Sequence, residues 1–146
     1  MPVTDDEVAA LRAYLRGNQA LQQELYGRMT TPAARARYSA LVAAAFFEAV
    51  DRRFGGRDSA SEVIEYVADV RARVPEVGQE IDPSPAERLI SRVMTGADTS
   101  DIAGRTKGKI FIVFLMALVS DAQYDDVQLE AFLAEARKTA DDGLEA

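Results

Sequence analysis

The chain contains no cysteine, no histidine and no tryptophan among its 146 residues. The absence of cysteine excludes disulfides, thiolate metal sites and cysteine nucleophiles. The absence of histidine removes the most frequent general base, the most frequent transition-metal ligand and the side chain that usually titrates near neutral pH. No remaining nucleophile stands beside an activating base, so we expect a protein that is not an enzyme and carries no cofactor or metal.

Positive charge is also scarce. The 17 Lys and Arg residues are outnumbered by 24 Asp and Glu residues, which gives a formal net charge of −7. This acidic balance argues against nucleic acids and anionic membranes as partners. The first residues, MPVTDDE, have neither the basic nor the apolar region of a secretory signal. We therefore expect a soluble, cytoplasmic protein, and the excess of Arg over Lys is a mild hint of a bacterial genome rich in GC.

Long apolar runs are limited to one, the ten residues IFIVFLMALV at 110–119. The run is too short to cross a bilayer, which takes roughly 20 residues. Its first half is rich in strand formers, but no second candidate strand exists to pair with it. We therefore expect a helix over about 100–120. A helix that is apolar on every side needs cover on every side, so this run indicates the centre of the fold or an oligomer interface.

Signals for helix starts and ends recur along the rest of the chain. A capping box at Thr4–Glu7 begins the first helix, and Gly17-Asn18 either divides 5–29 into two helices or lies within one. Thr31-Pro32 and Gly55-Gly56 delimit a helix over 32–54. Three more helices are expected after the capping box at 59–62, after Ser84-Pro85 and after Asp125-Asp126, with a loop over 75–84 and a frayed tail from about 141.

These signals predict an all-α fold, a single-domain bundle of six or seven helices over residues 1–146. Helices 32–54 and 100–120 are the expected central pair, because their apolar surface exceeds a single stripe. Phe47, Val50 and Phe54 widen the apolar arc of the first of these helices well past half its circumference. We therefore expect these three residues to form an interface with a protein partner or with a second copy in a homodimer.

Three cations, Arg105, Lys107 and Lys109, precede the apolar run within the segment GRTKGK. The segment differs from a phosphate loop, because three residues rather than four separate its glycines and no Ser or Thr follows the final lysine. A weaker hypothesis is that these cations hold an anion at the start of a helix. The simpler interpretation, which we favour, is a solvated helix end.

Four acidic residues, Asp121, Asp125, Asp126 and Glu130, surround the turn before the last expected helix. Oxygen ligands suit Mg²⁺ or Ca²⁺, but the alternating acids and central glycine of an EF-hand are missing. Acidic residues are also favoured at a helix N-terminus, where they complement its dipole. We therefore favour helix capping over metal binding.

Two functions remain compatible with these patterns. The first is a non-enzymatic interaction or regulatory module that acts through helical surfaces as a homo-oligomer. The alternative is a bundle that binds an anionic or amphipathic small molecule between aromatic walls, with Arg105 or Lys109 holding the anionic group. The alternative requires a well-formed pocket of roughly 300 Å³ or more.

Overall fold

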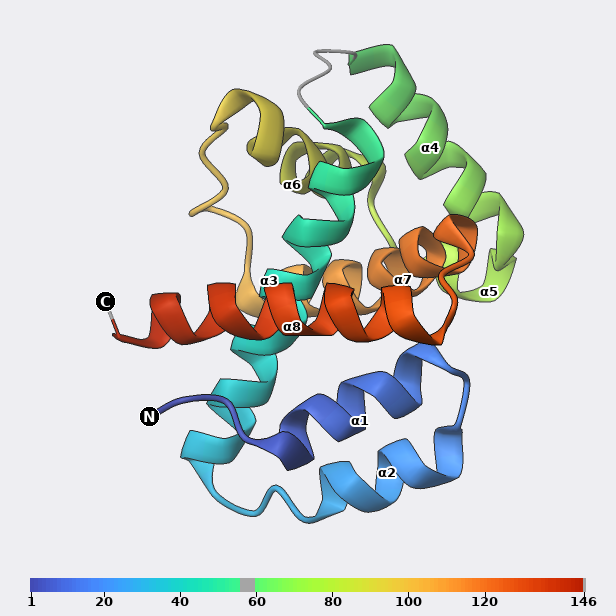
Figure 1. The fold of residues 1–146 in the computed structure, drawn as a ribbon. Helices are drawn as coiled ribbons and strands as arrows, with labels where there is room; N and C mark the ends of the chain where they lie inside the picture. Colours follow the sequence, from blue (N-terminus) through green and yellow to red (C-terminus); the bar gives the residue numbers. More distant parts are fainter. Residues whose placement is uncertain (56–59, 146) are drawn as a thin grey trace.

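The computed structural model describes residues 1–55 and 60–145, and within them it shows eight helices and no strand (Figure 1). The predicted all-α class is confirmed. Residues 5–29 form two helices, one of the two expected alternatives, and a short helix at 75–78 raises the number above the expected six or seven. The helices are α1 (Asp5–Leu15), α2 (Gln19–Gly27), α3 (Pro32–Phe54), α4 (Ala60–Arg73), α5 (Pro75–Gly78), α6 (Pro83–Thr95), α7 (Gly104–Ala122) and α8 (Asp126–Glu145).

Local capping explains where the first three helices begin. The Thr4 hydroxyl accepts a hydrogen bond from the Glu7 amide, and the Glu7 carboxylate accepts one from the Thr4 amide, which confirms the capping box. Gly17 has a φ of 74°, and the Asn18 side chain then caps α2. Thr31 caps α3, so the predicted bounds of 32–54 are confirmed.

Two segments differ from the expectation. The loop expected over 75–84 contains α5, which begins at Pro75, a residue whose fixed φ suits a first helical turn. The tail expected to fray continues as α8 to Glu145, and Asp141 within it accepts a hydrogen bond of 2.7 Å from the Val3 amide. The capping box expected at 59–62 depends on Ser59, which lies outside the described residues.

Helix α3 is the central element of the fold (Figure 1). Helices α7 and α8 cross it on opposite sides, the α1–α2 pair lies at one end, and α4 and α6 lie at the other, with α5 packed against α4. Phe46 of α3, Phe114 of α7 and Phe132 of α8 are all fully buried. The expected pairing of α3 with α7 is present, but α8 packs against α3 at least as extensively.

Helix α7, which contains the apolar run, is not buried on every side within a single chain. Helix α3 covers one side, whereas α1 and α6 cover only the flanks. Ile110, Phe114, Leu115, Leu118 and Val119 are buried, but Phe111, Ile112, Val113, Met116 and Ala117 are only partly buried. In the part of the chain that the structure describes, no helix has both the length and the apolar character that crossing a membrane requires.

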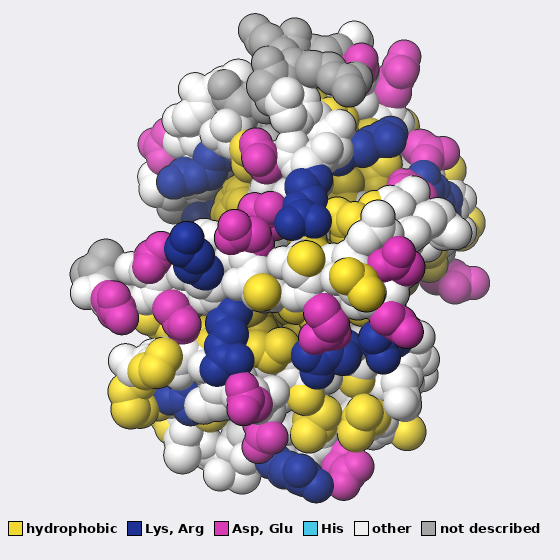
Figure 2. Space-filling view, in the orientation of Figure 1, with side chains coloured by type: hydrophobic (Ala, Val, Ile, Leu, Met, Phe, Trp, Pro, Cys, Tyr) yellow, Lys and Arg dark blue, Asp and Glu magenta, His cyan; other side chains and the backbone are white. Residues whose placement is uncertain are grey.

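Charged side chains of both signs are interspersed over the face seen in Figure 2. Many of them are paired between helices. Arg12 of α1 binds Glu130 of α8 through two contacts of 2.6 Å, and Arg137 of α8 binds Asp5 at 2.8 Å. These pairs are exposed, so they guide the docking of α8 against α1 more than they stabilise it.

Candidate ligand-binding groove

A groove of about 670 Å³ lies where α2, α3 and α7 meet, with the end of α1 beside it. It is open to solvent and larger than the roughly 300 Å³ expected of a small-molecule site. We call it the aromatic groove. Its lining consists of Tyr14, Gln19, Gln22, Gln23, Tyr26, Tyr38, Ser39, Val42, Gly104, Lys107, Gly108, Phe111 and Ile112.

The aromatic walls of the groove are held in place by contacts with the rest of the fold. The rings of Tyr26 and Tyr38 meet edge to face, with their centroids 5.7 Å apart. Phe111 lies against the buried ring of Phe46 at 4.9 Å. The Tyr14 hydroxyl donates a hydrogen bond of 2.9 Å to the Ile112 carbonyl, and burial raises the pKa of Tyr14 to about 12. The walls are therefore preformed and uncharged at neutral pH.

Tyr38 is the unusual member of the lining. Its side chain is 6% exposed, and its hydroxyl has no hydrogen-bond partner, unlike every other buried side-chain polar atom of the described residues. Burial raises the pKa of Tyr38, and the nearby Gln22 side chain offsets part of that rise without reaching the geometry of a hydrogen bond. A buried donor without a partner costs about 1–3 kcal/mol, so this hydroxyl calls for an explanation.

The electrostatic character of the groove is opposite to that of the whole chain. The net charge is −7, yet the lining contains no carboxylate, and its single charged side chain is Lys107. Gly104 of the lining is also the first residue of α7. The preceding Ala103 has no side-chain oxygen to cap the helix. The start of α7 therefore presents the positive end of its dipole without a side-chain cap.

The structure does not bring together the three cations proposed to hold an anion. Lys107 lines the aromatic groove, whereas Arg105 and Lys109 line a separate cavity of about 390 Å³ beside Glu80 and Asp82. Lys109 is bound to Glu80 at 2.6 Å. Residues 105 and 109 are one helical turn apart, and residue 107 lies on the other side of the helix. The cation beside the aromatic walls is therefore Lys107, not Arg105 or Lys109.

Two of the three residues expected at an interface lie inside the chain. Val50 is fully buried, and Phe54 is 3% exposed and contacts the Tyr66 ring at 5.8 Å. Phe47 is partly buried, and its ring meets Phe111 at 5.6 Å. The surface of a single chain therefore offers only Phe47 of this set.

The acidic turn serves helix capping, as expected. Asp125 accepts a hydrogen bond from the Gln128 amide at 2.8 Å, and the Gln128 side chain accepts one from the Asp125 amide at 2.9 Å. The other three acids are paired: Asp121 with Arg73, Asp126 with Arg16 and Glu130 with Arg12. Over residues 1–55 and 60–145, no three acidic side chains lie close enough together to hold a metal ion.

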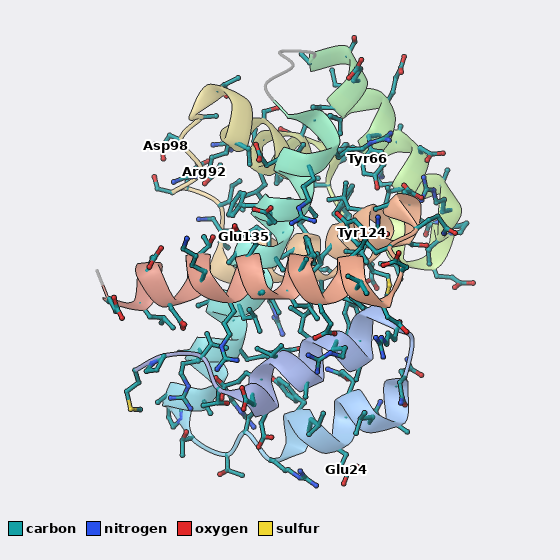
Figure 3. The ribbon with its side chains drawn as sticks, in the orientation of Figure 1. Glu24, Tyr66, Arg92, Asp98, Tyr124 and Glu135 are labelled. Atoms are coloured by element: carbon teal, nitrogen blue, oxygen red, sulfur yellow. The ribbon has the colours of Figure 1, made fainter. Side chains whose placement is uncertain are left out.

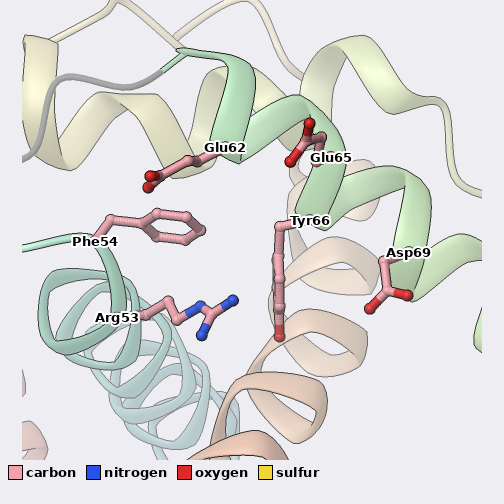
Figure 4. Close-up of a pocket in the computed structure, with 6 residues that line it drawn as sticks. All are labelled: Arg53, Phe54, Glu62, Glu65, Tyr66 and Asp69. Carbon is pink, nitrogen blue, oxygen red and sulfur yellow. The ribbon is translucent and has the colours of Figure 1, made fainter.

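A third cavity, also of about 390 Å³, lies between the end of α3 and α4 (Figure 4). Carboxylates Glu62, Glu65 and Asp69 line it, with the Arg53 guanidinium 5.1 Å from the centre of the Tyr66 ring. The Tyr66 hydroxyl points away from Glu62 and Glu65 (Figure 4) and donates a hydrogen bond of 3.0 Å to Asp121. Figure 3 shows where Tyr66 lies in the fold. Tyr66 therefore has the partner that Tyr38 lacks.

The sequence patterns did not identify Tyr14, Tyr26 and Tyr38 as members of one site. These residues come from three helices, and no local pattern shows that they meet. The helical spacing of Lys107 from Arg105 and Lys109 was a usable signal, because a separation of two residues places side chains on different faces. No protein-family model, curated protein or solved structure matches this chain.

Proposed function

We propose that this protein binds a small amphipathic organic molecule in the aromatic groove. The observation that carries the proposal is the buried, unpartnered hydroxyl of Tyr38 in an aromatic wall. Phenylalanine would fill the same space without the cost of an unsatisfied donor. The Tyr38 hydroxyl has almost no solvent-exposed surface, so a shift of the neighbouring Gln22 side chain would have to open it to the groove. A ligand with a hydrogen-bond acceptor would then satisfy this donor while its apolar part contacts Tyr14, Tyr26 and Phe111.

The proposal can be tested through the tyrosines themselves. The chain has five tyrosines and no tryptophan, and three of the five line the groove. Aromatic amphipathic compounds such as naphthalene derivatives should therefore shift the NMR signals of these tyrosine rings and raise the thermal midpoint. If no compound of this class changes either signal, the proposal is wrong.

Substitution of Tyr38 separates binding from folding. Tyr38→Phe should weaken binding about 2- to 12-fold, the range expected for one hydrogen bond. It should not lower the free energy of unfolding, because the deleted hydroxyl has no partner. Tyr66→Phe is the matched control: it should lower stability by about 1 kcal/mol through the lost bond to Asp121, with unchanged ligand affinity. Equal affinities for the Tyr38→Phe variant and the wild type would contradict the assignment.

A homodimer that acts as an interaction module is the second candidate. The partly exposed apolar side of α7, which includes Val113, Met116 and Ala117, favours it. A second copy of the chain covering this side would complete the burial of the apolar run. Light scattering should then give twice the chain mass at micromolar concentration, and a strict monomer at high concentration would contradict it.

A further inference from the structure

We infer that the aromatic groove selects an aromatic monoanion, with its carboxylate at the start of α7 and its ring among the tyrosines. The inference rests on the proposed binding function and specifies the chemistry of the ligand. It follows from three features of the groove: its charge, the bare backbone of α7 along one side, and the donor that Tyr38 contributes.

The charge of the lining favours an anion. Lys107 is its single charged residue, and within the described residues no carboxylate forms an ion pair with it. Hydrogen bonds from Arg88 lower the pKa of Asp101, and the positive charge of Lys107 helps to lower it further. That carboxylate is not free to pair with Lys107, because it already accepts two hydrogen bonds from Arg88. A cationic ligand would meet only the like charge of Lys107, whereas an anion gains a charge-assisted hydrogen bond.

The backbone of α7 lies open along the groove. Gly104 and Gly108 are one helical turn apart, both belong to the lining, and a Cβ atom added to either would meet no atom within 4 Å. Glycine weakens a helix relative to alanine, so two glycines one turn apart at the start of α7 lower its stability. Access of a ligand to the backbone would explain why they are present. Without side chains here, a carboxylate can approach the uncapped amides at the helix start.

The Tyr38 hydroxyl and the aromatic rings define the polar and apolar parts of the ligand. The Tyr38 hydroxyl has no hydrogen-bond partner, burial raises its pKa and keeps it protonated, and a shift of the neighbouring Gln22 side chain would let it donate a hydrogen bond to a ligand acceptor. The rings of Tyr14, Tyr26 and Phe111 favour an aromatic body, because aromatic rings pair through edge and offset contacts. An aromatic carboxylate combines all of these requirements in one molecule.

The first experiment compares two probes of the same shape. Isothermal titration calorimetry of the full chain gives its affinities for 1-naphthaleneacetate and for the neutral 1-naphthaleneacetamide. The carboxylate should bind about tenfold more tightly, the usual gain of a charge-assisted over a neutral hydrogen bond. Equal affinities would overturn the selection of an anion and leave the proposed function intact. Binding of neither compound would overturn both.

The second experiment adds a side chain at Gly108, where the backbone of α7 is exposed to the groove. Gly108→Ala should raise the thermal midpoint, because alanine is the better helix former, and should weaken 1-naphthaleneacetate binding about tenfold by occupying the groove. Gly143→Ala in α8 is the matched control, since a Cβ there also meets no atom within 4 Å and lies outside the groove. It should keep the affinity unchanged. Unchanged affinity in Gly108→Ala would overturn the placement of the carboxylate.

Substitution of Lys107 tests the charge directly. Lys107→Gln should bring the affinity for 1-naphthaleneacetate down toward that of the acetamide and leave the acetamide affinity unchanged. Lys109→Gln, on the other side of α7 and paired with Glu80, should alter neither affinity. Retention of the preference for the carboxylate in Lys107→Gln would show that this cation does not select the anion.

Discussion

Replacing Glu7 by alanine should destabilise the protein far more than its surface ion pairs would suggest. The side chains of Glu7 and Arg37 are 4% and 13% exposed, and they meet at 2.9 Å. The same carboxylate accepts hydrogen bonds from the Thr4 amide at 3.1 Å and the Thr4 hydroxyl at 2.6 Å. The substitution would thus leave a nearly buried guanidinium without its partner and remove half of the α1 capping box.

The size of the loss follows from these contacts. Removing one partner of a buried ion pair costs about 3–5 kcal/mol, and the residual exposure of Arg37 places this pair near the lower end. Loss of an N-terminal cap costs about 1 kcal/mol, part of which is already contained in that range. We expect a loss of about 3 kcal/mol. For a domain of this size, the thermal midpoint should fall by about 6–12 °C.

Glu130→Ala provides the matched control. It also removes the bidentate partner of an arginine, since both Arg12 contacts measure 2.6 Å, but these side chains are 31% and 48% exposed. An exposed pair contributes at most about 1 kcal/mol. Urea unfolding followed by circular dichroism would give both free energies. Similar losses in the Glu7→Ala and Glu130→Ala variants would refute the reasoning that burial sets the contribution of these pairs.

Two further predictions concern pH and packing. Burial alone would raise the pKa of Glu7, but hydrogen bonds from Arg37 and Thr4 outweigh it and hold the pKa below its ordinary value. The stabilisation is therefore present above the unfolded pKa of about 4.3 and lost as the pH falls through the lower folded value. Wild-type stability should fall more steeply with acid than that of Glu7→Gln in urea titrations, and parallel slopes would contradict this. Gly78→Ala should cost about 2 kcal/mol or more, because its Cβ would lie 2.1 Å from the Arg71 carbonyl oxygen. A thermal midpoint equal to that of the wild type would show that α5 shifts freely.

The helix boundaries were largely predictable, because the signals that set them are local. Thr31 followed by Pro32 begins α3, and the capping box of Thr4 and Glu7 begins α1. The interactions involved span three residues, so they can be read directly from the sequence. The four-residue α5 was missed because its starting proline also ends the preceding helix.

The groove was not predictable, because it depends on which side of α7 stays uncovered. Ile112 and Met116 are as apolar as the buried residues beside them, and only the positions of α1 and α3 leave them partly exposed. Tyr38 likewise fits the apolar face of α3, and nothing in its neighbourhood along the chain reveals that its hydroxyl lacks a partner. Long-range packing decides both features, whereas periodicity reports only which residues can be buried.

The central position of α3 also has a consequence for synthesis on the ribosome. About 70 residues separate the end of α3 from the start of α8, which covers one of its sides. At about 5–20 residues per second, that side stays uncovered for roughly 4–14 s after α3 has been made. The nascent chain therefore passes through a stage in which its central helix offers an apolar surface to chaperones or to neighbouring chains. Emergence of α8 ends this stage.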